Sequence, residues 1–164
     1  MTAGIHHVAF ACRDAEATHR FYSQVLGFPL VHTELSRFGQ GWFRHFFYDL
    51  GNDASIAFFE LHGVGEPTPP KTAISTDLGY PIWVNHVAVR VDREAQQRLV
   101  AKVRDAQLDV VLEHDHGWCH SVYLRDPNGI LVELCADHEG GMPVDLAEAE
   151  RLRTVIPAWL ASSP

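Results

Sequence analysis

The stretch Ile5-His6-His7-Val8-Ala9-Phe10 returns 79 residues further along the chain as Val84-Asn85-His86-Val87-Ala88-Val89. Each stretch lies in a short apolar run, which is typical of a buried strand rather than of a surface helix. His7 and His86 occupy the same place in the two stretches. The recurrence therefore predicts that one structural unit occurs twice in this chain.

The same order of predicted elements follows each copy of this motif. Asp14 is placed to cap a helix, because its carboxylate can accept hydrogen bonds from the first free amides, and Gly27 stands where helices commonly end. Gly51-Asn52-Asp53 and Asp126-Pro127-Asn128-Gly129 are typical turn sequences. The predicted first half has a strand over 5–12, a helix over 15–26 and strands over 29–35, 42–50 and 54–61. The predicted second half has a strand over 83–91, a helix over 93–106 and strands over 109–114, 119–124 and 130–135.

Two segments fall outside this repeated pattern. Residues 63–82 contain four prolines and three glycines, which predicts a linker without regular structure. Residues 137–164 form a C-terminal extension with one expected helix over 146–155, ended by Pro157. The expected organisation is a single domain over 3–136, with module one over 3–62 and module two over 83–136, followed by this extension.

The composition limits the kinds of partner. The 164 residues include 13 Lys and Arg against 21 Asp and Glu, a formal net charge of −8. An acidic chain without a basic cluster repels phosphate backbones, so we expect no nucleic-acid partner.

No apolar run approaches the roughly 20 residues of a membrane-spanning helix, and the first residues lack the pattern of a signal peptide. The three cysteines have no CxxC spacing, and we expect free thiols in the cytoplasm.

Each predicted module pairs a histidine on its first strand with a glutamate on its last strand. His7 precedes Glu60 by 53 residues, and His86 precedes Glu133 by 47. A carboxylate within an apolar strand is costly to bury unless a positive group accompanies it. If the modules pack about a pseudo-twofold axis, the four side chains converge, and two imidazoles with two carboxylates suit a divalent cation. A single histidine or glutamate on a strand is more often hydrogen-bonded or solvated, but the recurrence of the pair favours a metal site.

Four stretches of the chain resemble the vicinal oxygen chelate superfamily, which includes glyoxalase I, type I extradiol dioxygenases, methylmalonyl-CoA epimerase and the fosfomycin- and bleomycin-resistance proteins. They are the two strand motifs quoted above, Phe21-Tyr22-Ser23-Gln24-Val25-Leu26-Gly27-Phe28, and Tyr123-Leu124-Arg125-Asp126-Pro127-Asn128-Gly129-Ile130-Leu131-Val132-Glu133-Leu134. The resemblance implies an α+β fold in which two βαβββ modules form a cupped mixed sheet around a metal. The ligand set that it implies is His7, His86 and Glu133, with Glu60 at the family's fourth ligand position.

The favoured function is an Fe(II) extradiol-type dioxygenase that cleaves the ring of a catechol-like substrate with two neighbouring oxygens. Such enzymes bind iron through two histidines and one glutamate, which leaves open positions for substrate and oxygen. The resemblance extends to His114 as an acid–base histidine and to Tyr123, ten residues before Glu133, as a hydrogen-bonding group near the substrate oxygens. His45, within Arg44-His45, resembles a further active-site histidine on the third strand of the metal-bearing module. A neutral histidine is suited to taking a catechol proton and returning it later.

Two alternative functions remain open at this point. A glyoxalase I-like isomerase or an epimerase would bind Ni, Co or Zn through all four positions and move a proton beside a carbonyl with one glutamate; Mn is a further candidate metal. The second alternative is a non-enzymatic protein that binds a small molecule such as an antibiotic. Glu60 separates the two enzyme hypotheses, because only the isomerase requires it as a ligand. We expect a homodimer, because an incomplete cupped barrel has exposed edges that need covering.

Overall fold

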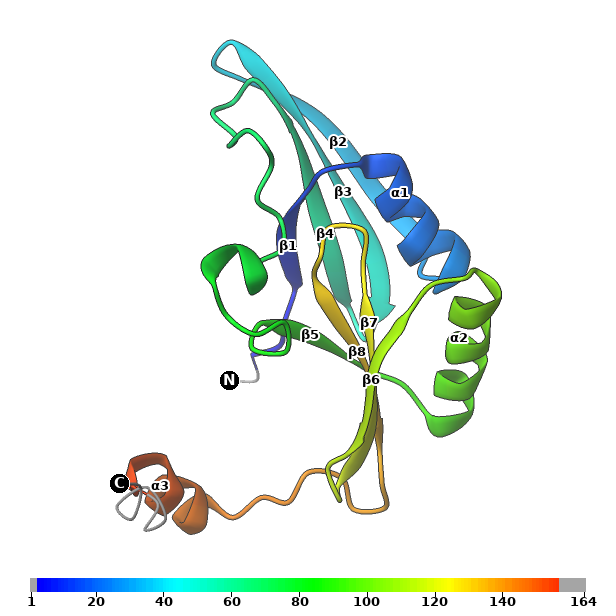
Figure 1. Ribbon diagram of the computed structural model, residues 1–164, viewed down its shortest axis with the longest axis vertical. Coiled ribbons are helices and arrows are strands. Elements are labelled where there is room, and N and C mark those ends of the chain that lie inside the picture. The colour runs from blue at the N-terminus through cyan, green and yellow to red at the C-terminus, as the bar shows by residue number, and fades with distance from the viewer. Residues whose placement is uncertain (1–2, 157–164) are drawn as a thin grey trace.

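The structure, a computed structural model, describes residues 3–156 and contains two four-stranded mixed sheets (Figure 1). Module one contains β1 (His7–Cys12), α1 (Ala15–His19), the π-helical η1 (Arg20–Val25), β2 (Leu30–Phe38), β3 (Gly41–Gly51) and β4 (Ala54–His62). Module two contains β5 (His86–Arg90), α2 (Arg93–Asp105), β6 (Val110–Asp115), β7 (Cys119–Arg125) and β8 (Leu131–Asp137). The strand orders are β1-β4-β3-β2 and β5-β8-β7-β6, with the first strand of each sheet parallel to the last. The α+β fold of two βαβββ modules is confirmed.

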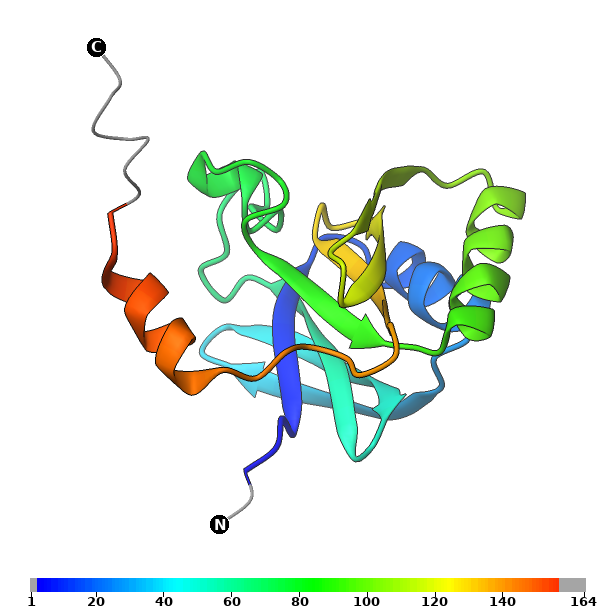
Figure 2. The ribbon, with the colours of Figure 1, turned by 90° about the horizontal axis from the view of Figure 1, so that it is seen from below.

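The C-terminal helix α3 (Leu146–Thr154) lies away from both sheets (Figures 1 and 2). It begins at Asp145, whose carboxylate accepts a hydrogen bond from the backbone N–H of Glu148 at 2.9 Å. The expected helix at this place is therefore present, while Pro157, its expected end, lies outside the described residues. Within residues 3–156, no helix is both long and apolar enough to cross a membrane.

The first helix departs from the regular helix that the sequence predicts over 15–26. Asp14 caps it as expected, accepting a hydrogen bond from the Ala17 N–H at 2.9 Å. From Arg20 onward the turns widen to the π-helical η1, and the Leu26 N–H bonds the Phe21 carbonyl at 3.0 Å. The wider turns bring two adjacent aromatic residues, Phe21 and Tyr22, into the core together. Apolar periodicity alone does not distinguish such a turn from an α-helical one.

Each sheet has one face covered by helices and one face that the helices leave open. Side chains alternate between the two faces along a strand. On β1, Val8, Phe10 and Cys12 point into the core, whereas His7 and its alternate neighbours are exposed. We call these the helix face and the open face. The core joins the helix faces of both modules and includes Phe21, Tyr22, Phe46, Tyr48, Ile56, Phe58, Val100, Val103, Val122, Leu124, Ile130, Val132 and Leu134.

A buried hydrogen-bond network at the turn between β7 and β8 ties the two modules together. The Asp126 carboxylate accepts bonds from the Tyr22 hydroxyl at 3.0 Å, from the Asn128 backbone and side chain at 2.9 Å each, and from the Ile130 N–H at 2.7 Å. The Asn128 amide also donates to Thr18 of α1 at 3.2 Å. Burial raises the pKa of Asp126, although these bonds oppose the shift. The turn of module two is therefore bonded to the first helix of module one.

The predicted linker takes part in the same junction. It has irregular structure apart from the short 3-10 turn η2 (Thr76–Leu78). Thr72 accepts from the Arg13 guanidinium at 2.8 and 3.0 Å and donates to the Asn128 carbonyl at 2.7 Å. A Cβ on Gly129 would lie 2.6 Å from that of Ala73. The linker thus packs closely against the turn that joins the modules.

Replacement of Tyr22 by Phe tests this junction. The change removes one donor from the buried Asp126 carboxylate while the ring stays in place. We expect the free energy of unfolding to fall by about 1–3 kcal/mol, because a buried acceptor loses a partner. Urea denaturation measures this loss, and Tyr80→Phe, at an exposed position, is the control. An unchanged midpoint for Tyr22→Phe would show that this bond does not stabilise the junction.

Candidate metal centre

His86 and Glu133 meet on the open face of module two. The strand register places Ala88 opposite Glu133, so His86 and Glu133 point to the same side of the sheet. The distance from His86 Nε2 to Glu133 Oε2 is 3.1 Å, and the glutamate is buried. On its other side, His86 Nδ1 lies 2.9 Å from the carbonyl oxygen of Trp83. Two strands and the segment before β5 therefore orient this imidazole.

The contact between His86 and Glu133 requires a positive charge. A carbonyl oxygen only accepts hydrogen bonds, so His86 Nδ1 carries a hydrogen and donates it to Trp83. In a neutral imidazole, the bare Nε2 lone pair then faces a carboxylate oxygen of Glu133. Two acceptors at this distance repel each other unless a proton or a metal cation lies between them. The pair therefore has the donor chemistry of a metal site.

Tyr123 and Ser121 complete the surroundings of Glu133. Ser121 donates a hydrogen bond to Glu133 Oε1, which leaves Oε2 to face His86. Tyr123 lies opposite Glu133 on β7, and its ring packs edge-on against His86 with centroids 5.9 Å apart. Burial, together with the charge of Glu133, raises the pKa of Tyr123. The phenol therefore keeps its proton at neutral pH and can donate a hydrogen bond.

The hairpin between β6 and β7 brings His116, a residue for which the sequence predicts no role, close to this face. His114 lies opposite Ser121 and shares the open face. Its ring packs edge-on against His116 at 4.5 Å between centroids, and His116 Nε2 lies 3.1 Å from the Tyr123 hydroxyl. The His116 N–H bonds the Cys119 carbonyl at 2.9 Å, so the tight turn holds His116 near β7. Closely spaced histidines are the only sequence signal for this placement.

Within residues 3–156, one set of three side chains brings its potential metal-ligand atoms close together. His116, Cys119 and Glu133 each offer a ligand atom, and these atoms lie within 4.8 Å of one another. No other group of three or more histidine, cysteine, aspartate or glutamate residues in that range is so close. The set His7, His86 and Glu133 is therefore not brought together at that distance within one chain.

His7 lies on the open face of module one. Its Nδ1 is 2.8 Å from His6 Nδ1, and its ring packs edge-on against Phe47 at 5.4 Å between centroids. In Figure 2 the N-terminal end of β1 (dark blue) lies apart from the N-terminal end of β5 (green). His7 is the first residue of β1, and His86 is the first residue of β5. The two histidines occupy equivalent places in their modules, but those modules present them on different open faces.

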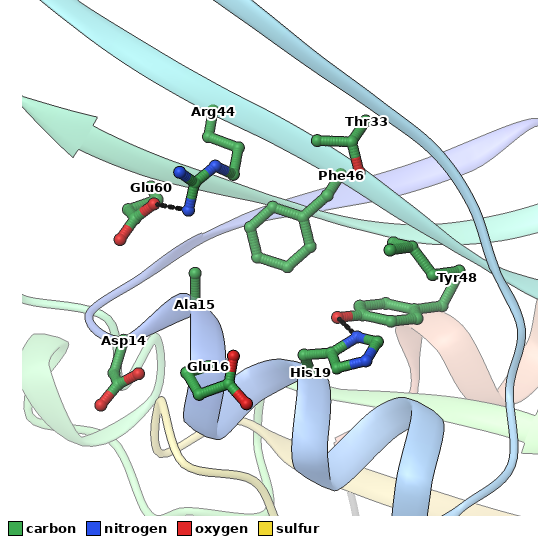
Figure 3. A pocket seen from close by; sticks show the side chains of 10 residues that line it. Asp14, Ala15, Glu16, His19, Thr33, Arg44, Phe46, Tyr48 and Glu60 are labelled. Atoms are coloured by element: carbon green, nitrogen blue, oxygen red, sulfur yellow. Dashed lines mark hydrogen bonds and ion pairs between the residues drawn. The ribbon is translucent and has the colours of Figure 1, made fainter.

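Glu60 lies on the opposite side of its sheet from His7. The register pairs Glu60 with Cys12 on the helix face, and Ala57 is the residue that corresponds to Glu133. Arg44 Nη1 donates to Glu60 Oε2 at 2.8 Å. Both line a cavity of about 400 Å³ beside α1, shown in Figure 3. The expectation that two histidines and two glutamates converge is therefore not met, because Glu60 lies three residues after Ala57, the position that corresponds to Glu133.

His45 is a buried histidine with one nitrogen unpaired. Its ring stacks on Phe59 with centroids 3.7 Å apart, and its Nδ1 lies 3.2 Å from Glu34 Oε1. Its Nε2 is buried and has no hydrogen-bond partner among residues 3–156. Burial lowers the pKa of His45, while Glu34 opposes the shift. His45 shares the open face of module one with His7, and their ring centroids are 6.3 Å apart.

A sequence model of the Glyoxalase/Bleomycin resistance protein/Dioxygenase superfamily matches residues 4–134, most of the chain. The chain belongs to this superfamily. Among curated proteins, it is 33% identical over 72 residues to a Bacillus subtilis (strain 168) protein, MhqE, whose name describes a ring-cleaving dioxygenase. That match covers 43% of this chain and 24% of MhqE. The chain thus spans about a quarter of the length of this curated relative.

Solved structures of the superfamily share the fold at low sequence identity. A domain from Frankia sp. EAN1pec has a TM-score of 0.63 and 20% identity, covering 85% of this chain and 96% of that one. The Listeria monocytogenes fosfomycin resistance protein FosX, in complex with Mn(II), has a TM-score of 0.57 and 17% identity, with 92% and 99% covered. The antibiotic-binding protein TnmS3 from Streptomyces sp. CB03234 has a TM-score of 0.60 and 17% identity, with 84% and 98% covered. The superfamily fold thus occurs in proteins described as resistance proteins and as binding proteins.

The lowered pKa of His45 predicts a pH-dependent loss of stability. Above the ordinary histidine pKa of about 6.5, the side chain is neutral in both the folded and the unfolded chain. Below that pH the unfolded chain binds the proton first, so folding becomes less favourable as the pH falls. We expect the free energy of unfolding to decrease less steeply below pH 6.5 in His45→Phe, which retains a ring beside Phe59. Identical pH profiles for both proteins, measured by urea denaturation, would contradict this expectation.

Proposed function

We propose that this protein is a metal-dependent enzyme and that His86 and Glu133 of one chain, with His7 of a second copy, hold the metal. The observation that carries the proposal is the contact between His86 Nε2 and the buried Glu133 carboxylate. Because Nδ1 of the same ring donates to the Trp83 carbonyl, this contact is favourable only with a cation or a proton between the two groups. A bound divalent metal satisfies both side chains at once.

The proposed ligands suit Fe(II). Two imidazoles and one carboxylate form the ligand set of non-haem iron oxygenases, which keep further positions open. Glu60, on the helix face and paired with Arg44, is unsuited to be a fourth ligand. This placement supports the three-ligand dioxygenase over the four-ligand isomerase. Among the other candidate metals, Mn is present in the FosX structure described above.

A second copy is proposed because the donors stand on two different open faces. His7 is exposed on module one, whereas His86 and Glu133 stand on module two. In a twofold dimer, module one of each chain can cover module two of the other, and both contacts are identical. Each chain then contributes to two centres. This arrangement would also cover His7 and His86, which the single chain leaves exposed.

The proposed reaction is extradiol cleavage of an aromatic ring that carries two neighbouring hydroxyl groups. Bound iron supplies chelation of the two substrate oxygens and a position for dioxygen. His114 would take the proton of a substrate hydroxyl, and Tyr123, protonated at neutral pH, would donate a hydrogen bond to a substrate oxygen. The unpaired Nε2 of His45 offers a further polar contact from module one.

The side chains around His45 suit an aromatic substrate. Phe47 and Phe59 pack against the His45 ring, and Phe43 packs edge-on against Phe59. They share the open face of module one with His7. A mostly apolar wall with a few polar groups is typical of small-molecule sites. The partial similarity to MhqE supports the same substrate class.

Two matched substitutions test the ligand assignment. Glu133→Gln and Glu60→Gln each remove one carboxylate charge from the last strand of a module. After anaerobic loading with Fe(II), we expect Glu133→Gln to lose the iron and oxygen uptake with a panel of catechols. Glu60→Gln should keep both, because its partner is Arg44. Iron retention in Glu133→Gln, or equal loss in both variants, would overturn the proposal.

Mixing of two inactive variants tests whether the centre is shared between copies. His7→Ala and Glu133→Gln should each lack iron alone. A mixed dimer has one centre with both defects and one intact centre, so refolding the two together should recover about a quarter of wild-type activity per chain. Each variant refolded alone is the control. Failure to recover activity in a dimer that has formed would show that one chain supplies all ligands.

A further inference from the structure

We infer that His116, Cys119 and Glu133 form a second metal-donor set, which lies within a single chain and suits a thiophilic divalent cation such as Zn(II). The three ligand atoms lie within 4.8 Å of one another, and this is the closest donor group of its kind in residues 3–156. The set needs neither His7 nor a second copy. Its existence therefore does not depend on the proposed function, although it shares Glu133 with it.

The strand pattern explains why these side chains meet. Cys119 and Ser121 are alternate residues of β7 and point to the same face as Glu133 of β8. Cys119 Sγ lies 3.6 Å from the Ser121 hydroxyl, and that hydroxyl bonds Glu133. Ser121 therefore bridges the thiol and the carboxylate. Both Cys119 and Glu133 are buried, so the protein holds them in place before a metal binds.

The β6–β7 hairpin supplies the third donor. Gly117 adopts a positive φ of 81°, and its N–H donates to the Asp115 carboxylate at 2.8 Å. Asp115 is also bonded by His138 Nε2 at 3.0 Å, which ties the hairpin to the segment after β8. This turn places His116 near β7, with its Nε2 3.1 Å from the Tyr123 hydroxyl. Because His116 is exposed, a cation can approach the set from its side.

The donor types identify the class of metal. Zinc is commonly bound by imidazole nitrogen, thiolate sulfur and carboxylate oxygen at about 2.0–2.3 Å, which places neighbouring donors about 3.5 Å apart. Rotation of the exposed His116 side chain can close the remaining gap. On binding, the Cys119 thiol loses its proton to solvent and the sulfur bonds the metal. Three protein donors leave the fourth tetrahedral position for water. A thiolate ligand favours zinc over the hard cations that prefer oxygen.

The shared carboxylate makes this set a competitor of the proposed iron site. Glu133 Oε2 faces His86, and its Oε1 faces Ser121 on the side of Cys119. A zinc ion bound to Cys119 and His116 would engage the carboxylate that the iron site needs.

Cobalt(II), which replaces zinc in such sites, provides a spectroscopic test. Titration of the metal-free full-length protein with Co(II) should produce a near-ultraviolet thiolate-to-cobalt charge-transfer band. We expect Cys119→Ser to abolish the band and His116→Ala to weaken cobalt affinity at least about tenfold. His116 is exposed, so His116→Ala tests the site without a change to the core. His7→Ala should keep the band, because His7 lies outside the set.

The other two cysteines provide matched controls. Cys135 lies opposite Ser121 on the same face, and Cys12 lies on the helix face of module one. Cys135→Ser and Cys12→Ser should both keep the charge-transfer band. Absence of the band in the wild-type protein, or its survival in Cys119→Ser, would overturn the inference. Loss in Cys135→Ser with survival in Cys119→Ser would assign the metal to a different thiol and overturn it equally.

The outcomes separate this inference from the proposed function. Iron binding and oxygen uptake that depend on Glu133, without a cobalt–thiolate band, would refute the second donor set and leave the dioxygenase intact. A cobalt–thiolate band in a protein that retains no Fe(II) and cleaves no catechol would do the reverse.

Discussion

The buried carboxylate of Asp126 is the interaction on which the arrangement of the two modules depends. It lies in the turn between β7 and β8, yet it is bonded by Tyr22 from the first helix of module one. Together with Asn128 and Thr72, it fixes the turn, the helix and the linker as one unit. The two helix faces then share a single core, and the open faces are left for other contacts. The separation of His7 from His86 follows from this packing.

Local patterns in the sequence predicted much of the fold. The order of elements in both modules, the Asp14 cap and the two turns all follow from residue types with strong backbone preferences. His7 and His86 occupy equivalent places on the first strands, as the repeated motif predicts, although the strands begin at these histidines and not at residues 5 and 83. These features depend on residues close in the chain, where propensity and periodicity carry the information. The π-helical turn at Arg20–Val25 does not follow from local patterns in the sequence, because core packing rather than apolar spacing distinguishes it from an α-helix.

The candidate site was harder to predict, because it depends on register between strands. Glu60 and Glu133 both interrupt an apolar last strand, and the local pattern treats them alike. Pairing with β1 and β5 separates them, since Glu60 is opposite Cys12 whereas Glu133 is opposite Ala88. An odd shift in register reverses the face of a side chain. Likewise, the approach of His116 to Glu133 depends on how the β6–β7 hairpin folds back, which no spacing of residues reveals.

The difference in register also has a consequence for symmetry. Ala57 stands in module one where Glu133 stands in module two, so only one half of the chain carries a carboxylate beside its first-strand histidine. The two halves therefore present different side chains beside the first-strand histidine, and they are not interchangeable. The two modules share the same strand order but not the same chemistry. In the proposed dimer, two chains form two centres, and each centre receives its carboxylate from module two alone.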